Sequence, residues 1–224
     1  MRRPQPRPIT PKPPRLRELW AERGFSAADL LNVWTPAAPG ARQESVRYGD
    51  APRQMLDVYR PRHATHAPMV VFFYGGSWQT GTRDLYAFLG NALAAQGIVA
   101  VVPDYTVFPE ARFPVFLEDA ARAVAFAREH APSWGADPRR LVLMGHSAGA
   151  HIAAMLACDR QWLDGVGLDA HRDVAGLVGL AGPYDFLPIE SRVLQEIFGG
   201  AARLETQPIS FVTGREAPAL LVTA

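Results

Sequence analysis

The chain of 224 residues is 48% hydrophobic and 20% charged, a length and composition typical of one soluble globular domain. Its formal net charge is +1 at pH 7, so we expect no nucleic-acid partner and no membrane binding that depends on bulk charge. Cys158 is the only cysteine and Lys12 the only lysine. A single cysteine excludes an internal disulfide and a cysteine-based metal site. The lone lysine lies in a Pro/Arg-rich segment, which argues against a Walker A loop and a pyridoxal Schiff base.

The first fifteen residues carry six prolines and four arginines and almost no apolar side chains. Such a segment cannot bury enough surface to fold, so residues 1–15 are predicted to be a disordered arm and residues 16–224 a single domain. No apolar stretch of signal-peptide length follows Arg2 and Arg3, and no run approaches the length of a transmembrane helix. The sequence therefore predicts a cytoplasmic protein without a membrane span.

Beyond this arm, short strand-like runs alternate with stretches of helical spacing. Residues 44–48 and 55–59 flank a Gly-Asp-Ala-Pro turn and are predicted to form an antiparallel pair. Further strands are predicted at 69–73, 98–102, 141–144, 174–180 and 217–223, helices at 85–96, 116–130 and 148–158, and a loop at 132–138. Strands that alternate with helices require crossover connections. The predicted fold class is therefore α/β, with a mainly parallel sheet and helices on both faces.

The sharpest chemical signal is the run Gly145-His146-Ser147-Ala148-Gly149, which has the pattern G-x-S-x-G. It lies between a predicted strand and an Ala-rich helix, where a sharp turn exposes a serine hydroxyl above the sheet. Small flanking residues are needed because this turn brings the helix and strand backbones close together. We expect Ser147 to be a nucleophile; the alternative is a Gly-rich helix start with a capping serine.

A nucleophilic serine also needs hydrogen-bond donors for the oxyanion that forms when it attacks a carbonyl group. The Gly-rich run 74–78 follows the third predicted strand, at the chain position from which a loop reaches such a site. The backbone N–H groups of Gly76, Ser77 and Ala148 are predicted to form this oxyanion hole. The alternative for the run is a simple β-turn.

These motifs together resemble the α/β-hydrolases, in particular bacterial carboxylesterase-like enzymes of the hormone-sensitive-lipase and feruloyl-esterase-like branch. The resemblance implies Ser147 as nucleophile and the N–H groups of Gly76, Ser77 and Ala148 as oxyanion donors. One departure is Tyr74, which stands where the family usually has His in H-G-G-x-W and which helps to shape the loop. The residues that carry the resemblance are 74–78, 102–105, 108–110, 113–114, 137–139, 143–151 and 179–186.

A second departure concerns the rest of the catalytic triad, which in this family runs Ser, then Asp or Glu, then His. Only His151 and His171 follow Ser147; we expect His151 to pack or cap, and His171 precedes the next strand, in the wrong order. In the family the acid lies just beyond the strand that corresponds to residues 219–223. We therefore expect a C-terminally truncated hydrolase that lacks the acid, the base and the last βα unit.

Other polar residues are weaker candidates. Asp104, Asp119 and Asp185 are expected to hold loops, as their counterparts do in the family. His63 and His66 are expected to be solvated loop residues. We expect no metal ion and no cofactor.

The function that the sequence predicts is hydrolysis of small carboxylic esters through an acyl-enzyme on Ser147. Hydrolysis of an aryl formamide by the same parts and a non-catalytic binding role remain open alternatives. The apolar run 218–223 is predicted to form an exposed edge strand through which the chain associates with itself.

Overall fold

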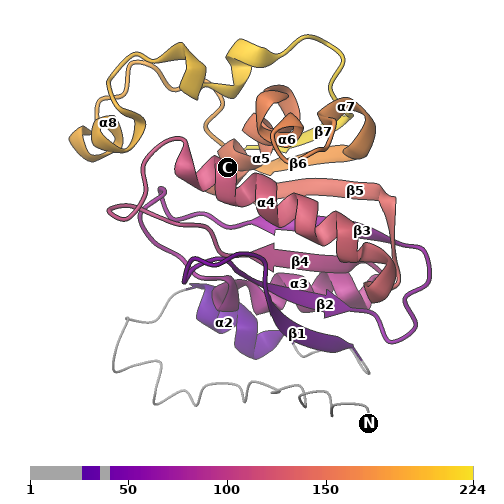
Figure 1. The fold of residues 1–224 in the computed structure, drawn as a ribbon. Coiled ribbons are helices and arrows are strands. Elements are labelled where there is room, and N and C mark those ends of the chain that lie inside the picture. The colour runs from indigo at the N-terminus through magenta and orange to yellow at the C-terminus, as the bar shows by residue number, and fades with distance from the viewer. Residues whose placement is uncertain (1–26, 36–40, 224) are drawn as a thin grey trace.

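A computed structural model describes residues 27–35 and 41–223. The predicted arm of residues 1–15 and the domain boundary at residue 16 lie outside the described residues. Within them, the predicted α/β fold is confirmed (Figure 1).

The centre of the described fold is a seven-stranded sheet in the order β1-β2-β4-β3-β5-β6-β7. The β1–β2 and β2–β4 pairs are antiparallel, and the pairs from β4 through β3, β5 and β6 to β7 are all parallel. A parallel sheet places the carboxyl ends of its strands along one edge, where loops can combine into a site. The strands are β1 (Arg42–Arg47), β2 (Met55–Arg60), β3 (Ala67–Phe73), β4 (Val99–Pro103), β5 (Ala136–His146), β6 (Gly176–Leu180) and β7 (Ala219–Val222).

Helices cover both faces of the sheet: α4 and α5 lie on one face, and α3 with α2 lies on the other (Figure 1). The α-helices are α2 (Ala27–Trp34), α3 (Ala87–Ala95), α4 (Val115–His130), α5 (Ala148–Cys158), α6 (Gln161–Asp164), α7 (Ala170–Asp173) and α8 (Arg192–Phe198). The 3-10 turns are η1 (Arg83–Tyr86), η2 (Ala131–Trp134), η3 (Leu204–Thr206) and η4 (Pro208–Phe211).

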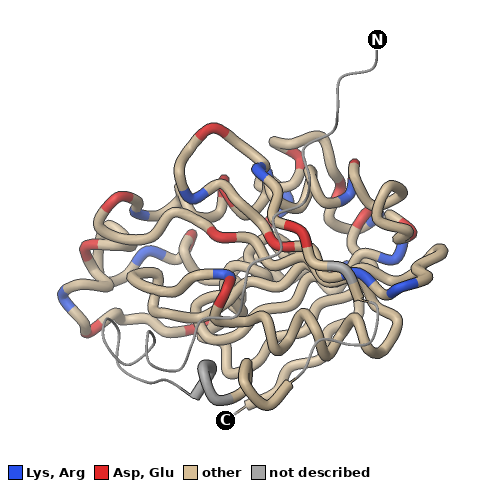
Figure 2. The backbone as a smooth tube through the Cα atoms, turned by 90° about the horizontal axis from the view of Figure 1, so that it is seen from below, with Lys and Arg blue, Asp and Glu red and all other residues tan. Residues whose placement is uncertain are grey.

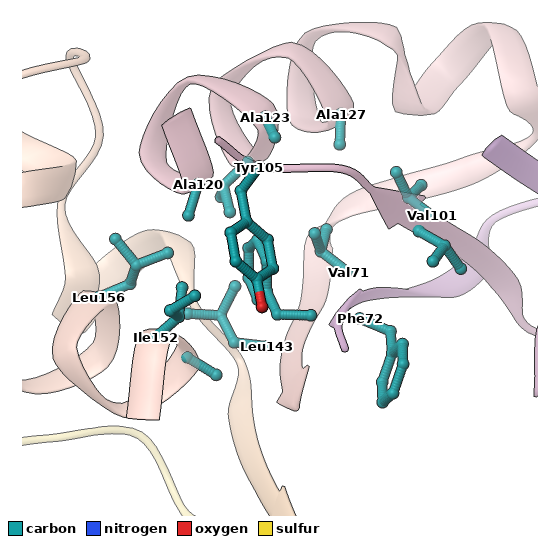
Figure 3. Close-up of a cluster of buried hydrophobic side chains, with 14 of the residues drawn as sticks. Val71, Phe72, Val101, Tyr105, Ala120, Ala123, Ala127, Leu143, Ile152 and Leu156 are labelled. Atoms are coloured by element: carbon teal, nitrogen blue, oxygen red, sulfur yellow. The ribbon is translucent and has the colours of Figure 1, made fainter. Parts of the chain in front are cut away.

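The core lies between the sheet and α4, where small side chains let the helix approach closely. Figure 3 shows Ala123 and Ala127 of α4 turned toward Val71 and Tyr105, and all four are fully buried. Leu143 of β5 completes this layer. Burial of large apolar side chains is worth about 1.5–3 kcal/mol each, so this layer holds the central strands in place.

Charged residues avoid the middle of the sheet. Figure 2 shows Lys, Arg, Asp and Glu mostly in loops and near helix and strand ends, and the buried strands β3 and β4 contain none of these residue types. Among the described residues, no helix combines the length and the apolar character that crossing a membrane requires.

Most elements form where the sequence predicts them, and the differences have local causes. The predicted helix 85–96 begins as the 3-10 turn η1 and becomes α-helical only at Ala87. β5 starts at Ala136 instead of 141, because Ala136 pairs with Ala67 across a register shift. The predicted loop 132–138 is therefore wrong: it holds the end of η2 and the first residues of β5.

Candidate active site

Ser147 occupies the turn between β5 and α5 in a strained backbone conformation, with φ 52° and ψ −119°. A non-glycine residue adopts positive φ only where its surroundings fix it. The N–H of Ser147 donates to the carbonyl oxygen of Leu180, 2.8 Å away. A Cβ at Gly145 would collide with the carbonyl of Gly149, and one at Gly149 would collide with the carbonyl of Phe73. The glycines predicted to be necessary here are therefore required by close backbone contacts.

The Gly-rich loop after β3 lies beside this serine, because β3 and β5 are neighbours and their ends are level, with Phe73 paired to Gly145. A Cβ at Gly75 would stand 3.1 Å from the Cβ of Ser147. The structure thus brings together two segments that the sequence separates by about seventy residues.

Within this loop the run Gly76-Ser77-Trp78 has positive φ at all three residues, at 141°, 52° and 57°. The carbonyl oxygen of Gly76 accepts hydrogen bonds from the N–H groups of Gln79 (2.9 Å) and Thr80 (3.0 Å). In the part of the chain that the structure describes, the N–H groups of Gly76 and Ser77 donate no hydrogen bond. The bond from Gln79 to Gly76 is the one that closes a β-turn, so the loop contains the turn that the sequence left open, with positive φ at its central residues Ser77 and Trp78.

Trp78 anchors the far side of the loop in an aromatic cluster. Its side chain is 4% exposed and meets Phe198 and His151 edge to face at centroid distances of 4.8 and 5.1 Å. Its carbonyl oxygen accepts a hydrogen bond of 2.8 Å from the N–H of Phe108. Such aromatic contacts add to area burial and fix the loop against α5 and α8.

Tyr74 anchors the near side, in the position where a histidine is usual in the resembled family. Its fully buried ring stacks between Tyr105 and Tyr86, at 4.8 and 5.7 Å, and its hydroxyl donates to Oδ1 of Asp104 at 2.8 Å. Burial, reinforced by the charge of Asp104, raises the pKa of Tyr74 well above its usual value. The phenol therefore stays protonated and remains a donor.

His151 packs in the core, as the sequence predicts, and does not face Ser147 as a base. Its ring is fully buried, and its Nε2 donates to the carbonyl oxygen of Thr206 at 2.8 Å. Burial lowers the pKa of His151 to about 4. The ring is therefore neutral at neutral pH and is held away from proton transfer.

All six histidines of the sequence lie in the part that the structure describes, and in this part none hydrogen-bonds the Ser147 hydroxyl. His171 is in α7, which leads to the amino end of β6, opposite the edge that carries Ser147. His130 stacks on Phe126 at 3.9 Å. His63 and His66 precede β3. Only His146 lies next to the serine, and it is exposed.

All three aspartates are expected to hold loops, and the structure places two of them, Asp104 and Asp119, in such positions. Asp119 accepts hydrogen bonds from Thr106 Oγ1 (2.6 Å) and Gln54 Nε2 (2.7 Å), and Asp104 accepts from Tyr74. Asp185 is exposed in the segment after β6. No group of three or more His, Cys, Asp or Glu within residues 27–35 and 41–223 could hold a metal ion.

Sequence reasoning missed two arginines that bind these carboxylates. Arg83 donates hydrogen bonds from its backbone N–H and its guanidinium to Asp104, and from Nε to Asp57 at 2.9 Å. Arg53 donates hydrogen bonds to the two ends of the Gly-rich loop. Neither belongs to a short motif, because their partners come from other strands. These two arginines could have been found only by knowing the order of the strands in the sheet.

The chain is similar to several known proteins. Rice "Probable isoprenylcysteine alpha-carbonyl methylesterase ICMEL1" is 44% identical over 111 residues, 49% of this chain and 26% of the relative. "Esterase LipC" of Mycobacterium tuberculosis is 36% identical and is matched over 74% of this chain and 46% of the relative. The zebrafish "Kynurenine formamidase" is 33% identical, over 79% and 61%. The chain thus spans about a quarter to three fifths of these relatives, and its expected truncation stays a prediction.

Solved structures share the fold. Esterase B from Lactobacillus rhamnosis, in an inhibited form, has a TM-score of 0.72 at 22% identity, covering 87% of this chain and 70% of that chain. Thermogutta terrifontis esterase 2, phosphoramylated by tabun, has a TM-score of 0.66 at 25% identity, covering 83% and 72%. The BD-FAE family model matches residues 56–223, which include the Gly-rich loop and the strained serine. The chain therefore belongs to the BD-FAE family, a carboxylesterase-like branch of the α/β-hydrolases.

Proposed function

We propose that this chain carries the nucleophile and the oxyanion hole of a serine hydrolase that acts on small carboxylic esters. The observation that supports the proposal most strongly is the strained backbone of Ser147, with φ 52° and ψ −119°, directly beside the Gly-rich loop. Strain of this kind persists at functional sites because the surrounding structure over-determines it.

The proposed chemistry is acyl transfer. The Ser147 oxygen attacks the ester carbonyl carbon and gives up its proton, and the carbonyl oxygen becomes an oxyanion. The N–H groups of Gly76, Ser77 and Ala148 bind that oxyanion, aided by the positive end of the α5 dipole. Collapse of the intermediate releases the alcohol with a proton and leaves an ester on Ser147. Water then attacks this acyl-enzyme and releases the acid.

The proton from Ser147 needs an acceptor. The expected rate of acylation therefore depends on whether a histidine can take this proton. His151 donates to Thr206 and is neutral, and His171 belongs to the opposite end of β6. Loss of a triad member lowers turnover by about 10⁴ to 10⁶. We therefore expect this chain of 224 residues to acylate slowly and to turn over more slowly still.

A second candidate reaction is hydrolysis of an aryl formamide, which passes through a similar tetrahedral intermediate. The observation that favours it is the match to zebrafish kynurenine formamidase over 79% of the chain. A non-catalytic binding role is the third reading, and it requires Ser147 to be inert.

The test follows acylation of the protein by 4-nitrophenyl acetate and by N-formylaniline. Intact-mass measurement should find one acetyl group on the wild type after long incubation and none on S147A, with formylation by N-formylaniline slower. Faster formylation would support the formamide reading. Equal modification of wild type and S147A would contradict the proposal and leave the binding role.

Three further expectations stay predictions. We expect association between copies of the chain through the exposed edge of β7, whose four residues are all exposed. The cytoplasmic location and the lack of nucleic-acid binding expected from the sequence also stay predictions.

A further inference from the structure

Arg53 connects the two ends of the Gly-rich loop, although it lies in the turn between β1 and β2. Its Nη2 donates to the Tyr74 hydroxyl at 2.8 Å and to the carbonyl oxygen of Gly81 at 2.6 Å. Its Nε donates to the carbonyl oxygen of Tyr105 at 2.8 Å. Tyr74 precedes the strained run and Gly81 follows it, so one guanidinium binds both flanks and the end of β4.

The loop between these flanks needs such a connection. Gly76, Ser77 and Trp78 are consecutive residues with positive φ, a conformation that relaxes unless neighbouring contacts fix it. The bonds from Gln79 and Thr80 to Gly76 close the turn from inside but do not fix its position relative to Ser147. Trp78 fixes one side of the loop against α5 and α8, and the position of Gly76 and Ser77 depends also on the two points where the loop leaves and rejoins the body of the fold.

The two ends of the Gly-rich loop, Tyr74 and Gly81, also pack against each other. A Cβ at Gly81 would stand 2.7 Å from the Tyr74 ring, so the flanking residues are in direct contact beneath the guanidinium. The hydroxyl of Tyr105 donates to the carbonyl oxygen of Tyr74 at 2.8 Å. Asp104 lies 4.0 Å from Arg53 and accepts from Tyr74, which supplies the opposite charge for a side chain that is only 29% exposed.

We propose that Arg53 is a positioning residue for the oxyanion loop: it holds Tyr74 and Gly81 at a fixed spacing and thereby keeps the Gly76 and Ser77 N–H groups beside Ser147. The inference rests on the proposed function for its catalytic meaning. Its geometric part, the order of the loop, stands independently. The planar fork of arginine matches two acceptors at once, which a lysine ammonium on a flexible stem does not.

The experiment compares R53M with R47M by amide hydrogen exchange measured by NMR. Arg47 is a matched control because it is an exposed arginine of the same hairpin whose Nη1 donates only to Gly49 and Ala51, in its own turn. R53M should speed exchange of the Gln79 and Thr80 amides at least tenfold, with amides in the centre of β3 unchanged. R47M should leave all of these amides as in the wild type.

Two further variants keep the test decisive if R53M does not fold. R53K retains the charge without the fork, and Y74F removes one of the three acceptors while keeping the ring; both should give smaller increases at the same amides. Unchanged exchange in every folded variant of Arg53 and Tyr74 would overturn the inference.

The effect of Arg53 on the reactivity of Ser147 is measured separately, as the rate at which a fluorophosphonate modifies Ser147. This rate should fall about tenfold in R53M and recover partly in R53K, with no change in R47M. If wild-type Ser147 does not react while exchange responds as expected, the proposed function fails and the positioning role stands. If Ser147 reacts equally in R53M and wild type, Arg53 has no role in the site.

Discussion

Ser147 lies in its strained conformation because three neighbours leave it no other. The two flanking glycines bring β5, α5 and the end of β3 into backbone contact, and the N–H of Ser147 is bound to the carbonyl of Leu180. A positive φ at a residue other than glycine costs about 1–3 kcal/mol. The fold meets this cost through buried packing around α5, ten of whose eleven residues are buried.

His151 gives the protein a specific dependence of stability on pH. Its surroundings are the rings of Trp78, Phe186 and Phe198 and the carbonyl of Thr206, none of which stabilises a positive charge enough to offset burial. In the unfolded chain the imidazole takes up a proton near its ordinary pKa of 6.5, whereas in the folded protein it does so only near 4. Its contribution to stability is therefore complete above pH 6.5 and is lost as pH falls toward 4.

The prediction is a difference between wild type and H151Q in urea unfolding at several pH values. Between pH 6.5 and 4 the free energy of unfolding of the wild type should fall by up to about 3 kcal/mol more than that of H151Q. Glutamine keeps a donor for Thr206 but does not titrate. Parallel pH profiles for the two proteins would show that His151 is charged or exposed in the fold, contrary to its buried position.

At the scale of single residues, the sequence predicts what a short motif contains and misses what distant segments contribute. Local patterns predict Ser147, Gly76 and Ser77, and the structure places Gly75 of the same loop next to Ser147. Arg53 is 21, 28 and 52 residues away in the chain from its acceptors Tyr74, Gly81 and Tyr105, so no local spacing marks them. Their meeting depends on the order in which β2, β4 and β3 pair.

At the scale of the elements, β7 is an edge strand of the described sheet, and all four of its residues are exposed. It pairs with β6 on one side, and Leu220, Leu221 and Val222 are 60%, 52% and 46% exposed. The carbonyl oxygens of Pro218 and Val222 accept bonds from Leu177 of β6 and from Ala181, which follows β6, so by alternation the backbone groups of Leu221 face away from the sheet. An exposed apolar edge of this kind invites pairing with another strand.

We expect the protein to associate through this edge at micromolar concentration. Sedimentation should show dimers or larger species for the wild type and a shift toward monomer for L221K, because a lysine places charge on the pairing edge. L204K is the matched control, since Leu204 is 68% exposed but lies in η3, away from the strand. A monomeric wild type, or equal sedimentation of all three proteins, would contradict self-association through β7.

The regular elements are predictable because their apolar patterns extend over whole helices and strands, and because turn residues mark their boundaries. The helix predicted at 148–158 matches α5 in full, and the strand at 69–73 lies within β3. The early part of β5 was not predicted, since Asp137-Pro138-Arg139 has the composition of a turn and its strand geometry depends on pairing beyond Ala67. The helix α8 was also missed: its seven residues are stabilised by packing of Ile197 and Phe198 on the body of the fold and carry little periodic signal.

At the scale of the whole molecule, the parallel sheet brings the site together. The loop follows β3, the serine follows β5 and the segment 181–186 follows β6, all at the carboxyl ends of neighbouring strands. The polar groups that position the loop come from the other half of the sheet, through β2 and β4. The pairing of β3 with β5 thus holds the serine and the loop in contact.

The most direct test of this account is the site and rate of modification by a fluorophosphonate, measured on the chain of 224 residues by intact mass and peptide mapping. The account predicts a single adduct on Ser147, absent in S147A, that forms about 10⁴-fold or more slowly than in a serine hydrolase with a complete triad. An adduct elsewhere, or none on Ser147 after long exposure, would contradict its role as nucleophile. Modification at the full rate would show that one of the six histidines acts as its base.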